Sequence, residues 1–186
     1  MEDLKNIIKE CASGNVRAQE KLYRLMAPKM FGVCLRYAKD STEAEDCLQE
    51  GFIKVFTNIK KFRHEGSLEG WVRRIMVNVS LEKFRKQQMM HPVEDVSIYE
   101  QQNISDNIIE KITADELMVL IQELPPRYRM VFNLYVMEGM NHKEISETME
   151  ISEGTSKSNL ARARDILKRK VTDIYGDIKT NSNYPA

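Results

Sequence analysis

One stretch of the sequence combines an aromatic ring, an amide and two guanidinium groups at intervals of three, four and seven residues. Trp71, Arg74, Asn78 and Arg85 follow this spacing, with Glu82 among them. Residues at these intervals share one side of a helix. An aromatic ring aligned with hydrogen-bonding groups stacks on, and bonds to, the bases of separated DNA strands. The alternative is that Trp71 is a partly buried core residue, and the pattern alone leaves both interpretations open.

A second candidate for nucleic-acid chemistry is a run of six small or polar residues from Gly154 to Asn159, followed by Arg162. A helix end that enters the major groove of DNA needs small donors and acceptors together with a cation. Lys157 places a cation within the run itself. A structural helical hairpin with a solvated basic face is the alternative. The basic patch and the helix pattern together favour DNA binding.

The elements predicted around this run form a helix-turn-helix. Thr113 with Glu116 forms a capping box that begins the C-terminal module, and Pro126 suits the first position of a helix. Asn141 begins the next helix, over about 142–149, with Glu144 in a capping-box arrangement. A three-residue turn containing Ile151 follows, and Ser152 caps a longer basic helix. The predicted apolar face of that helix comprises Leu160, Ala163, Leu167, Val171 and Ile174. A short helix, a tight turn and a longer basic helix are the helix-turn-helix pattern.

The first half of the chain is also predicted to be helical. The apolar series at 4–11 and 18–38, which includes Leu25, follows helical spacing, and Pro28 is expected to kink or restart the second helix. Thr42 and Glu45 suggest a capping box at the start of the next helix, and Ser67 caps the helix that carries Trp71.

The helix that follows Thr42 has two faces. Its apolar face comprises Leu48, Phe52, Val55, Phe56 and Ile59. A second stripe carries Asp46, Gln49, Glu50, Ile53 and Lys54. This stripe is either solvated surface or a protein-binding face with one apolar anchor, and its composition favours surface.

The overall net charge of zero conceals three blocks. Residues 1–89 carry 17 Lys and Arg against 12 Asp and Glu (+5), residues 90–123 carry 1 against 8 (−7), and residues 124–186 carry 10 against 8 (+2). Two basic modules separated by an acidic segment are therefore predicted. The predicted boundaries are a domain at 1–90, an acidic flexible linker at 91–111, a helix-turn-helix domain at 112–176 and a disordered tail at 177–186. We hypothesise that the linker screens the DNA-binding faces in the free protein.

Several classes of function have no support in the sequence. The three cysteines, Cys11, Cys34 and Cys47, are widely spaced, which predicts buried thiols in a reducing cytosol without zinc or disulfides. No nucleophile–base pair, phosphate-binding glycine loop or metal triad is present, so we expect neither an enzyme nor a cofactor. The chain has no signal-peptide pattern and no apolar run approaching the roughly 18 residues of a membrane span. A cytoplasmic protein without membrane insertion is expected.

Three motifs in fixed order resemble the bacterial sigma factors of the extracytoplasmic-function type, in the sigma-70 superfamily. The segment AEDCLQEGFIKVF is similar to the core-polymerase-binding motif. FTNIKKFRHEGSLEGWVRRIMVNVSLEKFRK resembles the promoter-melting helix, and LPPRYRMVFNLYVMEGMNHKEISETMEISEGTSKSNLARAR resembles the promoter-reading helix-turn-helix. The resemblance covers about residues 5–175. It implies a protein that binds core RNA polymerase and promoter DNA and helps to open the DNA for transcription initiation.

The resemblance also implies roles for individual residues. Polymerase docking falls to Asp46, Gln49, Glu50, Ile53 and Lys54. Recognition and melting of the minus-ten element fall to Phe62, Arg63, His64, Trp71, Arg74, Asn78 and Arg85, with the loop 62–66 capturing a flipped base. Recognition of the minus-thirty-five element falls to His142, Thr155, Lys157, Ser158 and Arg162.

Two positions depart from the family pattern. Gly51 stands where Thr is usual and is expected to loosen its helix, because Gly costs about 0.5–1 kcal/mol relative to Ala in a helix. Ser156 stands where Val is usual, so a hydroxyl replaces an aliphatic contact and the helix is expected to sit slightly differently.

The fold class predicted is all-α, with two small helical domains joined by an acidic flexible linker, the C-terminal one a helix-turn-helix. The resemblance also implies an anti-sigma partner, and we expect the free chain to be a monomer. Two other functions remain as alternatives: a conventional helix-turn-helix regulator that binds duplex DNA without polymerase, and a helical adaptor that binds only proteins. Binding to core polymerase separates all three.

Overall fold

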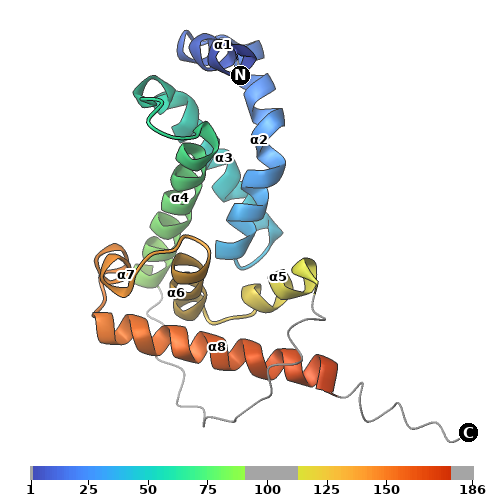
Figure 1. The fold of residues 1–186 in the computed structure, drawn as a ribbon, viewed down its shortest axis with the longest axis vertical. Helices are drawn as coiled ribbons and strands as arrows, with labels where there is room; N and C mark the ends of the chain where they lie inside the picture. The colour runs from blue at the N-terminus through green and yellow to red at the C-terminus, as the bar shows by residue number, and fades with distance from the viewer. Residues whose placement is uncertain (1, 91–112, 177–186) are drawn as a thin grey trace, which may run out of the picture. The chain divides into compact units, whose positions relative to one another are not determined.

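The computed structural model describes residues 2–90 and 113–176, and every regular element within these ranges is a helix (Figure 1). The chain divides into two compact units, Met1–His91 and Pro92–Ala186. The predicted all-α fold with two helical domains is therefore confirmed. The expected linker at 91–111 and tail at 177–186 lie outside the described residues, so their properties and the proposed domain boundaries stay predictions.

The N-terminal unit contains α1 (Glu2–Ala12), α2 (Val16–Tyr37), α3 (Ser41–Asn58), the short 3₁₀ helix η1 (Ile59–Lys61) and α4 (Leu68–Met90). Helices α2, α3 and α4 pack against one another, and α1 packs on α2 and η1. Full burial of a large apolar side chain contributes roughly 1.5–3 kcal/mol, so this shared core holds α3 and α4 together. Its largest fully buried side chains are those of Leu22, Met30, Tyr37, Val55, Ile59, Val72, Met76 and Val79.

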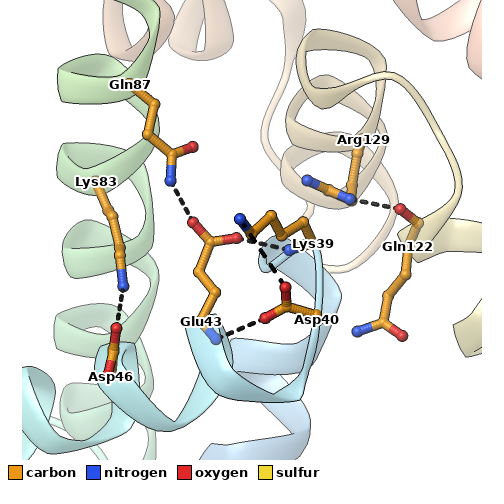
Figure 2. Close-up of polar contacts among 8 residues, drawn as sticks. All are labelled: Lys39, Asp40, Glu43, Asp46, Lys83, Gln87, Gln122 and Arg129. Carbon is orange, nitrogen blue, oxygen red and sulfur yellow. Dashed lines mark hydrogen bonds and ion pairs between the residues drawn. The ribbon is translucent and has the colours of Figure 1, made fainter. Parts of the chain in front are cut away.

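The start of α3 differs from the prediction. The expected capping box of Thr42 and Glu45 is wrong, because Asp40 is the N-cap and its Oδ1 accepts a 2.8 Å hydrogen bond from the backbone N–H of Glu43. The Glu43 carboxylate in turn accepts a 2.7 Å bond from the backbone N–H of Lys39 (Figure 2). The cap thus satisfies backbone donors two residues earlier than expected.

Helix α2 bears on two predictions. It does not restart at Pro28 but runs from Val16 to Tyr37, so a restart there is wrong and a kink stays a prediction. Pro28 is exposed, so water can solvate the one carbonyl that loses its hydrogen bond, that of Arg24. Leu25, expected on the apolar face, is 63% exposed at the edge of a surface cavity between α1, α2 and the loop 62–67.

Gly51 has a packing role that its helix propensity does not reveal. It is buried on α3 where that helix meets α4. A Cβ atom at this position would lie 2.2 Å from Sδ and 2.9 Å from Cε of the fully buried Met76. The absence of a side chain at Gly51 therefore makes room for the thioether of Met76. The prediction that Gly51 loosens α3 considered helix propensity alone and did not take this contact into account.

The second unit contains α5 (Ala114–Gln122), α6 (Pro126–Val136), α7 (His142–Met149) and α8 (Glu153–Gly176). Helices α5, α6 and α7 all pack on α8, the longest of the four (Figure 1). Capping boxes at Thr113 and Asn141 begin α5 and α7, and Pro126 occupies the first turn of α6, as predicted. Four residues of the predicted apolar face of α8 are buried: Leu160, Ala163, Leu167 and Val171. The fifth, Ile174, is 46% exposed, so its predicted place in the core is wrong.

Polar groups also join α5 to α6. The Arg129 guanidinium, only 4% exposed, donates from Nη1 to the backbone carbonyl of Gln122 (Figure 2). That carbonyl belongs to the last residue of α5 and is one of the acceptors that a helix end leaves unsatisfied. The bond therefore satisfies a carbonyl at the end of α5 and links that end to α6.

Candidate functional site

The residues of the stripe predicted to bind a DNA strand lie on α4, on the side away from the core. Ser67 caps the helix, since its Oγ accepts a 3.0 Å bond from the N–H of Gly70. Arg74, Asn78 and Arg85 are exposed, while Val72, Met76 and Val79 on the other side of the helix are buried. Trp71 is half-buried. The burial of one side by α2 and α3 leaves the polar side of α4 available to a ligand.

An aromatic group lies at the start of this face. The ring of Phe62 lies 5.6 Å from that of Trp71 and 4.6 Å from that of His64, in tilted and edge-on geometries that aromatic pairs prefer. His64 adopts a left-handed backbone conformation (φ 58°), which is uncommon outside Gly and Asn and turns the loop sharply. The loop 62–66 and the first turn of α4 are therefore one structural group.

This group encloses an open cavity of about 430 Å³. Its lining includes the aromatic Phe62 and Trp71 and three cationic side chains, Lys61, Arg63 and Arg74. An aromatic surface beside cations suits a base together with its phosphate. The remaining lining residues are Glu65, Gly66, Ser67 and Gly70. Trp71 is thus neither fully exposed nor plain core: it packs on Phe62 and forms part of the wall.

The predicted polymerase-docking stripe lies on the outer face of α3. Asp46, Gln49 and Glu50 are exposed, and Ile53 is 66% exposed among them. Lys54 is half-buried at the edge of the stripe. An apolar side chain surrounded by carboxylates and an amide is available to a partner, although single exposed apolar residues also occur on ordinary surfaces.

Ion pairs and hydrogen bonds link this stripe to α4. Lys83 of α4 donates to Asp46 at 3.1 Å, and Gln87 donates to the buried Glu43 (Figure 2). Lys54 bonds to Glu82 of α4 and pairs with Glu50 of α3 at 3.5 Å. The hydrogen bond to Glu82 raises the pKa of Lys54.

These cross-helix contacts join the two predicted interfaces. Glu82 belongs to the same stripe of α4 as Asn78 and Arg85, so its carboxylate would make that stripe less positive if it were unpaired. Pairing with Lys54 offsets that charge. The sequence pattern placed Lys54 only in the docking face and did not indicate this second role.

The helix-turn-helix has the predicted geometry. Helix α7 ends at Met149, Glu150 adopts the left-handed conformation (φ 56°), and the Oγ of Ser152 accepts a 3.0 Å bond from the N–H of Thr155 at the start of α8. Ile145 of α7 is fully buried. The turn and this apolar contact hold the first turns of α8 at the surface.

The residues predicted to contact the minus-thirty-five element divide into two groups. Thr155, Lys157 and Ser158 are exposed on the first turns of α8. Arg162 is half-buried: its Nη1 donates to the hydroxyl of Tyr128 at 3.2 Å, and its guanidinium lies 6.0 Å from the centroid of that ring. No sequence pattern pointed to Tyr128, which lies 34 residues away on α6.

His142 occupies a different environment from the exposed group. It is half-buried, its ring stacks on Tyr135 with 4.9 Å between centroids, and its Nδ1 lies 2.9 Å from Oγ of Ser156. Ser156 and Asn159 are both buried, so two of the six small or polar residues at the start of α8 point inward.

Other kinds of site find no support in the part of the chain that the structure describes. No group of His, Cys, Asp or Glu there has the arrangement of a metal site, and no helix there is long and apolar enough to cross a membrane. Cys11, Cys34 and Cys47 are buried free thiols. Burial raises the pKa of Cys34 to about 12, so this thiol stays protonated.

Comparisons with known proteins follow the division into two units. The family described as Sigma-70 region 2 matches residues 22–89, and Sigma-70, region 4, matches residues 114–167. The ECF RNA polymerase sigma factor SigM of Bacillus subtilis is 30% identical over 151 residues, which are 80% of this chain and 92% of that protein. The chain belongs to the sigma-70 family.

A second relative agrees with this assignment. The ECF RNA polymerase sigma factor SigW of Bacillus subtilis is 27% identical over 184 residues, 92% of this chain and 98% of that protein. A co-crystal structure of the sigma factor RpoE with the anti-sigma factor NepR from Bartonella quintana has a TM-score of 0.49 at 19% identity, and covers 83% of this chain and 96% of that one.

The chain is thus an RNA polymerase sigma factor of the extracytoplasmic-function type. It acts with core RNA polymerase in promoter-specific transcription initiation, and the alternative of a stand-alone regulator is set aside. The region 2 match spans α2 to α4, which carry the aromatic cavity and the α3 stripe. The region 4 match spans α5 to α7 and most of α8.

Proposed function

We propose that the residues of this sigma factor divide the work of initiation among three surfaces. Asp46, Gln49, Glu50, Ile53 and Lys54 on α3 bind core polymerase. The cavity walled by Phe62 and Trp71, with Arg63 and His64 on its loop, captures an extruded base of the minus-ten element, and Arg74, Asn78 and Arg85 hold the opened strand. Thr155, Lys157, Ser158 and Arg162 contact the minus-thirty-five element.

The observation that supports this proposal most is the aromatic cavity at the start of the polar stripe of α4. Extruding a base costs a few kcal/mol, and stacking a base on an aromatic side chain contributes about 1–3 kcal/mol. A protein without a nucleotide energy source offsets the cost of melting only by binding the opened strand more tightly than the duplex. Phe62 and Trp71, 5.6 Å apart, provide such a surface where Arg63 and Arg74 are available to phosphates.

We further propose that the chain acts as a binding subunit, without a catalytic centre or cofactor of its own. Its place of action is then the cytoplasm, where the polymerase and the promoter are. By analogy with its family, an anti-sigma factor holds it inactive, and the free chain is a monomer. Mass measurement of the free chain in solution tests the last point.

The experiment that tests base capture combines a change in the DNA with a change in the protein. Holoenzyme is bound to forked promoter fragments in which one minus-ten base at a time is replaced by an abasic site. With the wild-type chain, one position is expected to lose affinity by about 5- to 150-fold, corresponding to 1–3 kcal/mol. With Phe62→Ala, removal of the same base should have little further effect. Equal losses in both proteins would contradict the proposed cavity.

A further inference from the structure

Ser156 places a hydroxyl where the fold has no access to water. It lies in the second turn of α8 and is fully buried, whereas its neighbours Thr155 and Lys157 are exposed. A buried hydroxyl without a hydrogen-bond partner is destabilising. The side-chain partner in this structure is Nδ1 of His142, 2.9 Å from the hydroxyl oxygen. The departure from the usual aliphatic residue at this position is thus matched by a polar group on the preceding helix.

His142 is itself held in place. It is the first residue of α7, and its ring lies nearly parallel to that of Tyr135 on α6, with 27° between the planes. The guanidinium of Arg164 on α8 lies 5.5 Å from the centroid of the same Tyr135 ring. The contacts His142–Ser156 and His142–Tyr135, which we call the His142 link, therefore connect α6, α7 and the start of α8.

The His142 link lies where it can affect how the start of α8 recognises DNA. Leu160, Ala163 and Leu167 anchor the middle of α8 by apolar burial, which fixes depth but is not directional. A hydrogen bond depends on both distance and angle. The bond to Ser156 acts directly beneath Thr155, Lys157 and Ser158, so it restrains the rotation and depth of the turns that carry the exposed polar side chains.

We propose that His142 is a positioning residue for recognition of the minus-thirty-five element, acting through Ser156 on the seat of α8, and not a base contact in its own right. The inference rests on the proposed role of α8 in reading DNA. Base readout requires donors and acceptors within hydrogen-bond distance of specific groove atoms. A small displacement of the first turns of α8 alters several of these contacts together.

The test is a double-mutant cycle in full-length sigma factor assembled with core polymerase. His142→Phe retains an aromatic ring on Tyr135 but leaves the Ser156 hydroxyl without its partner. Ser156→Val leaves His142 without its partner. The double variant replaces both polar groups by apolar ones, a change that is nearly neutral for the stability of the fold when shapes are similar. Ser146→Val on α7 is the matched control, because that hydroxyl bonds only to the carbonyl of Lys143 in its own helix.

The readout is the preference of holoenzyme for the best minus-thirty-five sequence over each single-base variant, at one salt concentration because phosphate contacts are salt-dependent. Each single substitution is expected to reduce this preference about five- to tenfold, as expected when a buried polar group loses its partner. The double variant should lose about as much as either single variant and not the product of the two losses, because the same hydrogen bond is absent in all three. The control should retain the wild-type preference.

Three results would overturn the inference. Losses that simply add in the double variant mean that His142 contacts DNA directly, through Nε2. Lower melting temperatures with unchanged preference mean that the link stabilises the domain without positioning α8. Single variants that behave as wild type mean that the link has no role in reading. A wild-type protein that shows no minus-thirty-five preference would instead contradict the proposed role of α8, which keeps the two failures distinguishable.

Discussion

Gly51→Ala provides a sharp test of the packing between α3 and α4. The added Cβ would lie 2.2 Å from Sδ of Met76, well short of the roughly 3.5–4.0 Å of an ordinary contact. Met76 is fully buried, so its thioether has to move within a closely packed core. Overpacking of this kind costs about 1–3 kcal/mol.

A second effect has the opposite sign. Alanine is better than glycine in the middle of a helix by about 1 kcal/mol. The net change for Gly51→Ala in the wild-type chain is therefore a destabilisation of up to about 2 kcal/mol, the difference between the two effects. In a Met76→Val background Sδ and Cε are gone, so only the helix gain remains. Gly51→Ala should then stabilise the unit by about 1 kcal/mol.

Urea unfolding of the full-length chain measures both changes. The sequence contains one tryptophan, Trp71, which lies in α4, so its fluorescence reports on the N-terminal unit. The sign of the Gly51→Ala effect should reverse between the two backgrounds. Gly51→Thr, which introduces the residue usual in the family, should cost more than Gly51→Ala in the wild-type chain, because it adds more atoms. An effect of the same sign in both backgrounds would refute the assignment of Gly51 as space for Met76.

Further predictions concern the separate surfaces. The double variant Trp71→Ala, Asn78→Ala should leave polymerase binding intact but reduce open-complex formation by about 5-fold or more, because base stacking is lost. Open-complex formation should recover on a template whose minus-ten region is already mismatched. Reduced affinity for polymerase would show a structural role instead. Ile53→Glu should weaken binding to core polymerase about tenfold without changing the melting temperature, as expected for an interface anchor. The control Val16→Glu, at another apolar residue that is 73% exposed, should leave polymerase binding unchanged. Equal losses of binding in the two variants would argue against a docking face on α3. Burial raises the pKa of Cys34 from 9.0 to about 12, so unfolding releases a proton at any pH between these two values. The free energy of unfolding should therefore fall as the pH rises from 9 to 12, and more steeply in the wild-type chain than in Cys34→Ala. Parallel plots of stability against pH for the two proteins would contradict this.

Local signals in the sequence were sufficient for much of the fold. The capping boxes at Thr113 and Asn141, the start of α6 at Pro126 and the bounds of α7 depend on residues a few positions apart, and all were predicted. The start of α3 was predicted incorrectly, because several capping residues stand close together from Asp40 onward and only the path of the chain selects among them.

Contacts between distant residues were not predictable in the same way. The role of Gly51 depends on Met76, 25 positions away on another helix, so helix propensity described only part of its effect. His142 was singled out from the sequence as a DNA contact and Ser156 as a departure from the family pattern. The two were not paired, because they belong to different helices and the bond between them forms only when the chain turns between those helices. Leu25 follows helical periodicity yet remains exposed, since periodicity shows which face a residue occupies and not where the neighbouring helix ends.

We propose that this sigma factor gives core polymerase its choice of promoter and helps to open the DNA there. The most direct test is run-off transcription by core polymerase with and without the purified chain, on a matched promoter and on versions altered separately in the minus-thirty-five and minus-ten elements. A specific transcript should require the chain and both elements, and a mismatched minus-ten region should restore transcription to variants of the aromatic cavity. Promoter binding that is equally tight without core polymerase, together with no change in where transcription starts, would contradict the account.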